Sequence, residues 1–200
     1  MSCATANITF LPVQDAYVAE FYPDTNFGCS PYLFTNRFQG CGDIYRTYIK
    51  FDLCSMICNQ IPPNSCIRYA CLWFPLYRNE VPICGNTLYV YRVIQDWEEH
   101  CITWNNQPIT ALIPDGSTFV APDDQYVHID ITDLVNWWYN GLYPNFGLQL
   151  RCDEDFDSLL AFFSREYPNS DYWPRLTVWY SENCCSPFPC RCNSCDFASE

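Results

Sequence analysis

The stretch RTYIKFDL, residues 46–53, decides the fold because its side chains alternate along the chain. Ile49, Phe51 and Leu53 fall on one side of an extended backbone, whereas Tyr48 and its polar neighbours fall on the other. A period of two predicts a β-strand with one face in a core and the other in solvent.

Further stretches repeat this alternation, and turn signals such as PDTNFG, NQIPPNS, PDGS and YPNSDYWP separate them at short intervals. Many short strands punctuated in this way predict an all-β fold of antiparallel strands in a two-sheet β-sandwich. The further strands are expected at residues 66–78, 87–95, 126–131, 146–151, 159–164 and 175–180.

One short helix is expected at residues 133–140, with Thr132 as its N-cap and Gly141 as its stop. We expect this helix to close one end of the sandwich and its tryptophans to pack in the core. Its apolar stripe comprises Leu134, Val135, Trp137 and Trp138.

The chain is expected to divide into three parts. Residues 1–6 form an N-terminal connector, residues 7–181 form the sandwich domain, and residues 182–200 form a tail rich in Cys and Pro without periodicity.

The sequence holds 15 cysteines, an odd number. At least one must therefore stay free, bind a metal or pair with another chain. We expect most cysteines between residues 29 and 152 to pair within the chain. Those at the two ends are the candidates for disulfides between subunits: Cys3, Cys184, Cys185, Cys190, Cys192 and Cys195.

Composition limits the partners. With 23 acidic and 10 basic residues the net charge is -13, which argues against nucleic acid and anionic membranes, since both require clustered Lys and Arg. No apolar run approaches the length of a membrane helix, and the first residues have neither the basic start nor the apolar centre of a signal peptide. We expect an extracellular, spore-surface or cell-surface location reached without a recognisable signal peptide.

Catalysis has little support, and we expect no enzyme. The nucleophile elbow, the zinc-protease helix motif and phosphate-binding loops are absent from the sequence. Neighbouring acids such as Glu98 and Glu99, or the run of Asp153, Asp155 and Asp157, are interpreted as solvated loops rather than as a glycosidase pair.

No cofactor and no metal site are predicted. Four thiolates of the tail could in principle bind zinc. The tail has the pair Cys184 and Cys185 followed by a CxCxxC pattern, whereas structural zinc sites usually have two CxxC motifs separated by an ordered stretch. Calcium at Asp24, Asp43 or Asp153 has no motif behind it.

Sugar binding needs exposed flat rings beside amide or carboxyl groups. Asn105, Asn106 and Gln107 could donate or accept hydrogen bonds, although these residues are also typical of a turn. The candidate rings are Trp97, Trp104, Trp137, Trp138 and Tyr139.

Several phrases resemble the DNRLRE-domain, or disaggregatase-related, family: DAYV at 15–18, WNNQP at 104–108 and IDITDLVNWW at 129–138. The resemblance implies a jelly-roll β-sandwich that serves as an accessory module of extracellular proteins, in some cases for polysaccharide binding. A free-standing copy with so many cysteines favours a structural role. We therefore expect a non-catalytic subunit of a disulfide-crosslinked fibre, appendage or spore-surface layer whose partners are copies of itself. The alternative is a polysaccharide-binding module hardened by intrachain disulfides.

Overall fold

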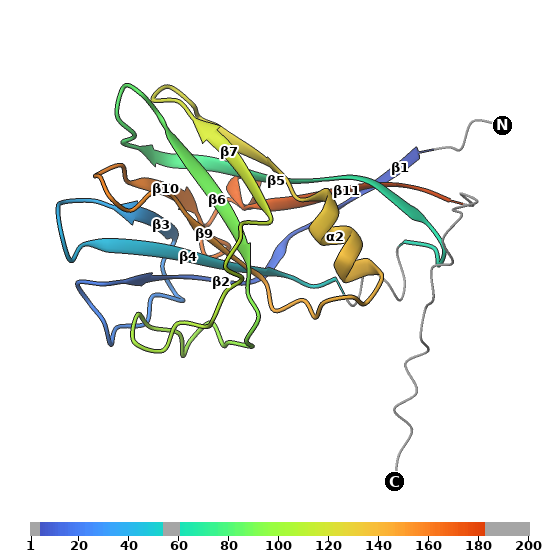
Figure 1. Ribbon diagram of the computed structural model, residues 1–200, viewed down its shortest axis with the longest axis horizontal. Helices are drawn as coiled ribbons and strands as arrows, with labels where there is room; N and C mark the ends of the chain where they lie inside the picture. Colours follow the sequence, from blue (N-terminus) through green and yellow to red (C-terminus); the bar gives the residue numbers. More distant parts are fainter. Residues whose placement is uncertain (1–4, 54–60, 183–200) are drawn as a thin grey trace, which may run out of the picture.

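The computed structural model describes residues 5–53 and 61–182, and these residues form eleven strands. Every predicted strand is present, and the all-β fold class is confirmed (Figure 1). The strands are β1 Thr5–Phe10, β2 Pro12–Ala19, β3 Tyr32–Arg37, β4 Ile44–Phe51, β5 Cys66–Asn79, β6 Asn86–Arg92, β7 Gly116–Val120, β8 Tyr126–Asp130, β9 Leu148–Arg151, β10 Leu160–Phe163 and β11 Arg175–Ser181. The helical elements are α2, Thr132–Tyr139, and a 3-10 turn η1, Ser170–Tyr172.

The strands form one curled sheet in the order β1-β11-β5-β10-β3-β4-β9-β6-β7, with β8 added to β5 and β2 added to β4. All of these strand pairs are antiparallel. The curl gives two layers: β1, β11, β5 and β8 lie in one, and β2, β4, β9, β6 and β7 lie in the other, while β3 and β10 connect them (Figure 1). This is a jelly-roll-like β-sandwich.

The main core fills the space between the layers with side chains from nearly every strand. This cluster includes Leu72 and Phe74 of β5, Ile49 and Phe51 of β4, and Phe162 of the connecting strand β10. Phe74 and Phe162 have ring centroids 5.2 Å apart. Such a core is what holds two apolar sheet faces together.

A second, smaller core covers the outside of the β2–β4 layer. Tyr48 is fully buried there with Trp97 and Ile102, which belong to the segment after β6. The expectation that Tyr48 lies on a solvent face is therefore wrong. A chain segment about fifty residues away covers that side of the strand, and the local period of two does not reveal it.

Helix α2 lies at one end of the sandwich, as expected (Figure 1). It begins at Thr132, whose hydroxyl accepts the N–H of Ala70 and whose own N–H donates to Asp130. The expected side-chain N-cap is not formed, since Ile131 occupies that position. The expected stop is present: Gly141 has a φ of 67° and donates its N–H to the carbonyl of Trp138.

Six of the described cysteines are free thiols, so the expectation of intrachain pairing is wrong for them. Cys71 and Cys152 are buried. Burial raises the pKa of the Cys152 thiol far above its ordinary value, which keeps it protonated. The other four are exposed: Cys29, Cys41, Cys84 and Cys101.

The candidates for intersubunit disulfides, namely Cys3 and the five cysteines of the tail, lie outside the described residues. So does most of the proposed 182–200 tail. Within the ranges that are described, the structure has no helix of the length and apolarity that a membrane crossing requires.

Candidate functional site

The outer side of the β1–β11–β5–β8 layer carries a row of large rings and polar groups. We call it the aromatic face and define it by Tyr69, Trp73, Tyr126, His128, Arg175 and Trp179. Unlike the outer side of the β2–β4 layer, it carries many exposed or half-exposed groups: Tyr69 is 40% exposed and Tyr126 is 55% exposed.

Strand register sets the neighbours on this face. Trp73 of β5 stands opposite Arg175 of β11 on one side and opposite His128 of β8 on the other. The Arg175 guanidinium carbon lies 5.1 Å from the centre of the Trp73 indole. The attraction between a cation and the face of an aromatic ring restrains the orientation of the ring.

Two hollows open on the face, and Trp73 lines both. The larger has a volume of about 420 Å³ and is bounded by Tyr126 and Tyr172 with the polar groups of Asn169 and Asp171. Its size falls within the range of about 300–1,000 Å³ typical of ligand pockets.

The smaller hollow has a volume of about 230 Å³ and includes His128, Arg175 and Trp179. The rings of Tyr69 and Trp179 continue the face along the strands, with centroids 5.2 Å apart. The two hollows therefore adjoin at one indole and together form an extended groove rather than a closed pocket.

The rings and their polar neighbours suit hydrogen bonding at neutral pH. A side-chain hydrogen bond with Cys71, followed by burial, raises the pKa of Tyr69 to about 12. Its hydroxyl therefore stays protonated and able to donate. Asn169 and Asp171 lie in and beside η1, where the Asn169 side chain accepts the N–H of Asp171.

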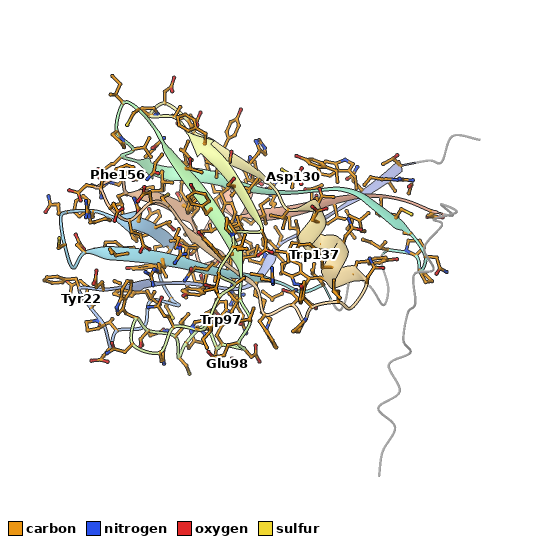
Figure 2. All side chains as sticks on the ribbon, viewed as in Figure 1. Tyr22, Trp97, Glu98, Asp130, Trp137 and Phe156 are labelled. Carbon is orange, nitrogen blue, oxygen red and sulfur yellow. The ribbon has the colours of Figure 1, made fainter. Side chains whose placement is uncertain are left out.

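The structure places the predicted sugar-binding rings elsewhere. Trp97, Trp138 and Tyr139 are buried, so their ring faces are packed against protein. Trp97 donates its indole N–H to the carbonyl of Phe146, 2.7 Å away. Figure 2 shows Trp97 and Glu98 on the opposite side of the molecule from Asp130, which lies on the β8 side of the aromatic face.

Trp104 and Trp137 are partly buried, and an arginine stacks on each. Arg46 lies 4.7 Å from the centre of Trp104, and Arg92 lies 5.8 Å from that of Trp137. Neither residue belongs to the aromatic face, and the structure does not gather the five predicted rings into one surface.

The side-chain amides of Asn106 and Gln107, in the WNNQP stretch, form hydrogen bonds within the protein. Asn106 accepts the N–H of Thr103 at 2.6 Å and donates to the carbonyl of Cys101 at 2.9 Å. Gln107 accepts from Arg46, which also pairs with Glu154. These groups stabilise the loop that covers the second core.

The acidic pairs considered for catalysis also have structural partners. The interpretation of Glu99 as a solvated acid is wrong: it is 5% exposed and forms two hydrogen bonds of 3.0 Å with Arg165. Asp157 pairs with Arg37, and Asp153 accepts the N–H of Asp155.

The candidate rings predicted from the sequence lie in α2 and in the segment after β6, whereas the aromatic face is built from strands and the η1 turn. The signal lay in the strands themselves. In CIRYACLWFPLYR and RLTVWY, Trp73, Arg175 and Trp179 occupy the phase opposite to the buried leucines and valines. An aromatic residue on the solvent-facing side of a strand is a candidate for a binding surface.

The chain thus combines a β-sandwich with an open groove of rings, amides and a carboxylate on the outer face of one layer. The profile of carbohydrate-binding module family 96 matches residues 6–179, and the chain belongs to that family. No curated protein matches the chain.

The resemblance to the DNRLRE-domain family is thereby corrected, because the family that matches is carbohydrate-binding module family 96. The phrases that carried the resemblance are structural. Asn106 of WNNQP holds a turn, and IDITDLVNWW spans the junction of β8 and α2. Residues that build a sandwich do not distinguish between families that share the fold.

Proposed function

We propose that this protein binds a polysaccharide through the aromatic face. The observation that carries the proposal is the position of Trp73, which lines both hollows beneath Arg175. The flat faces of pyranose rings are apolar and pack against indole, while their hydroxyls need hydrogen-bonding groups at the rim. Membership of a family of carbohydrate-binding modules supports this function. It also favours the alternative drawn from the sequence over the fibre subunit.

The proposed ligand is an uncharged polysaccharide. The whole chain has a net charge of -13, which repels a polyanion at long range. On the aromatic face, Arg175 and His128 are accompanied by Asp130 and Asp171 and do not form a basic patch. Rings and neutral hydroxyl partners therefore dominate the recognition.

An open groove suits a chain better than a single sugar, because adjoining hollows contact successive rings. We accordingly propose a role in attachment to a polysaccharide surface outside the cell, without catalysis. The binding energy would come from several weak contacts spread along the groove.

The test is retention of purified protein on insoluble glucan, xylan, mannan and chitin, and retardation in gels that contain soluble forms of them. We expect binding to at least one uncharged polymer and none to a polyuronate. Failure to bind every uncharged polymer would overturn the proposal.

A second candidate function is covalent assembly of copies of this chain, which the exposed thiols of Cys29, Cys41, Cys84 and Cys101 favour. Exposed thiols on separate loops are positioned to exchange with disulfides of neighbours. The terminal cysteines, Cys3 and those of residues 184–195, remain candidates for the same links. Reductant-sensitive species of high mass on a non-reducing gel would support assembly, and a sharp monomer would contradict it.

A further inference from the structure

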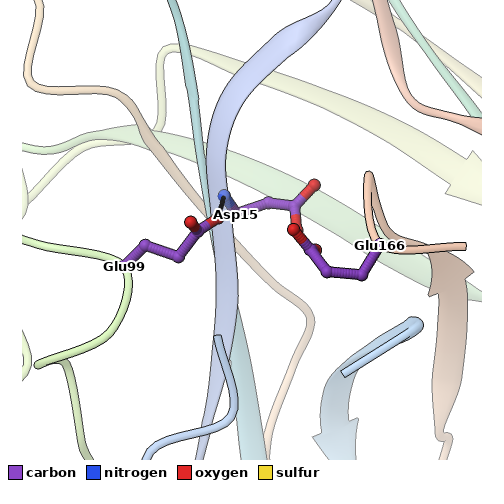
Figure 3. A group of neighbouring side chains, drawn as sticks. All are labelled: Asp15, Glu99 and Glu166. Carbon is purple, nitrogen blue, oxygen red and sulfur yellow. Dashed lines mark hydrogen bonds between the residues drawn. The ribbon is translucent and has the colours of Figure 1, made fainter. Parts of the chain in front are cut away.

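Three acidic side chains from distant parts of the sequence meet beside β2 (Figure 3). Asp15 lies in β2, Glu99 lies in the segment after β6, and Glu166 follows β10. Figure 3 shows the carboxylate of Asp15 directed toward that of Glu166. None of these three residues lines either hollow of the aromatic face, and the cluster plays no part in the proposed function.

The geometry of the cluster fits a single ion. One oxygen from each of the three carboxylates lies within 4.8 Å of the other two. Calcium binds oxygen at about 2.3–2.6 Å, so two oxygens on one ion can be at most about 5 Å apart. Each pair of these oxygens therefore lies within the span of one calcium ion.

Burial and charge leave the cluster unbalanced. Asp15 is 1% exposed and Glu99 is 5% exposed, while the side chain of Glu166 is 24% exposed. Arg165 is the one guanidinium that pairs with these acids in the described residues, and it contacts Glu99 and Glu166. Three carboxylates and one guanidinium leave a formal charge of about -2 in a mostly buried place, which is costly without a counter-charge.

Two oxygens in the cluster have no hydrogen-bond partner. Asp15 Oδ1 and Glu166 Oε2 are buried and accept no donor among the described residues. The other oxygen of Asp15 accepts the N–H of Arg165 at 2.9 Å, so the carboxylate is held with its free oxygen toward Glu166. Buried acceptors without donors point to a missing ligand.

We propose that Asp15, Glu99 and Glu166 bind one divalent cation, namely Ca²⁺. An ion of charge +2 balances the formal charge of the cluster, and its ligands here are all oxygen, which suits a hard cation rather than zinc. The exposed side of Glu166 admits the ion, and water completes the coordination. By joining three segments that are distant in sequence, the ion ties β2 to the loop that covers the second core and to the β10–β11 connection.

The alternative occupant is a proton. Burial, the largest cause, together with the neighbouring charge of Glu166, raises the pKa of Asp15 well above its ordinary value. A proton shared between Asp15 and Glu166 would relieve part of the repulsion without any metal. The experiment must therefore separate a calcium-dependent effect from a proton-dependent one.

The test is thermal unfolding of the full chain at pH 7.5 with a thiol reductant, first in EDTA and then in CaCl2, with calorimetric titration of CaCl2 into the EDTA-treated and desalted protein. We expect one ion to bind per chain. At Ca²⁺ concentrations 100-fold above Kd, the Tm should rise by about 5–10 °C. Absence of both binding heat and a Tm shift would overturn the proposal and assign the cluster to a shared proton.

The decisive variant is Glu166→Gln, which keeps the shape of the side chain and removes one repelling charge. In EDTA it should melt at or above the wild-type Tm, and in CaCl2 it should gain nothing, so the order of the two proteins reverses. A purely structural role for Glu166 predicts a lower Tm in both conditions. Retention of the calcium shift in this variant would also overturn the assignment.

The matched control is Glu154→Gln. Glu154 also pairs with an arginine, Arg46, and its side chain is 19% exposed. It lies outside the cluster, so its variant should keep the full Tm rise in CaCl2.

Discussion

The substitution Trp73→Ala tests the proposed binding face most directly. Trp73 lines both hollows, and Arg175 restrains its indole from 5.1 Å. Removal of the indole opens the wall between the hollows and leaves Arg175 without its stacking partner. The ligand would lose a flat apolar surface but keep the polar rim around η1.

The expected loss follows from the area of ring that a sugar covers. One face of an indole offers about 60 Å², which at about 25 cal/mol per Å² amounts to about 1.5 kcal/mol. If the C–H contacts of a sugar on the indole face contribute as much as an aromatic pair does, they add about 0.5–1.5 kcal/mol. A loss of about 2–3 kcal/mol weakens binding about 30- to 150-fold.

The assay is depletion of protein from solution by the best insoluble polysaccharide, fitted to a binding isotherm. Trp73→Tyr should retain part of the affinity because a flat ring remains. The matched control is Trp104→Ala, which removes another indole stacked by an arginine, on the opposite layer. Circular dichroism confirms that each variant is folded.

Affinity unchanged within threefold in Trp73→Ala would refute the reasoning. A large loss in Trp104→Ala, with none in Trp73→Ala, would move the site to the rings that the sequence suggested.

Three further predictions concern stability. Gly147→Ala should lower the free energy of unfolding in urea by about 2–3 kcal/mol. Gly147 has a φ of 93°, and a new Cβ would lie 2.6 Å from the carbonyl oxygen of Ile49 in β4. Gly141→Ala is the control: its φ is 67° but the space around it is open, so it should cost about 1 kcal/mol. Phe162→Ala should cost about 3–5 kcal/mol because the ring is fully buried, and a loss below 1 kcal/mol would contradict its place in the core. The N–H of Gly40 and then Arg37 lower the pKa of Asp157. The ionised form of Asp157 therefore stabilises the fold above about pH 4, and this contribution is lost as the pH falls through the lowered pKa. Asp157→Asn should reduce the fall of Tm at acid pH. An unchanged Tm–pH profile would contradict the pairing of Asp157 with Arg37.

Much of the fold is predictable from local patterns. The period of two located β4, β5 and β11, and Gly141 located the end of α2, because both signals arise from backbone geometry within a few residues. Strands with weaker alternation, such as β2, were not predicted. In β2 both faces are covered, so apolar residues occupy both phases.

The candidate site was not predictable in the same way. Trp97 and Trp73 are the same residue type, yet Trp97 is 6% exposed within the second core and Trp73 lines an open groove. The difference depends on the segment after β6, which folds over one layer and leaves the other bare. Exposure of a ring is thus a property of what lies above it.

The sequence by itself determined the alternation, the turns and the charge, and therefore an antiparallel all-β sandwich of acidic character. Only the tertiary structure decided which sheet face stays open and which acids meet. Asp15, Glu99 and Glu166 show no motif in the sequence, since 84 residues separate the first two and 67 separate the last two. The physical reason is that strand pairing and layer packing bring distant segments together, whereas sequence patterns report only what a residue does to its immediate neighbours.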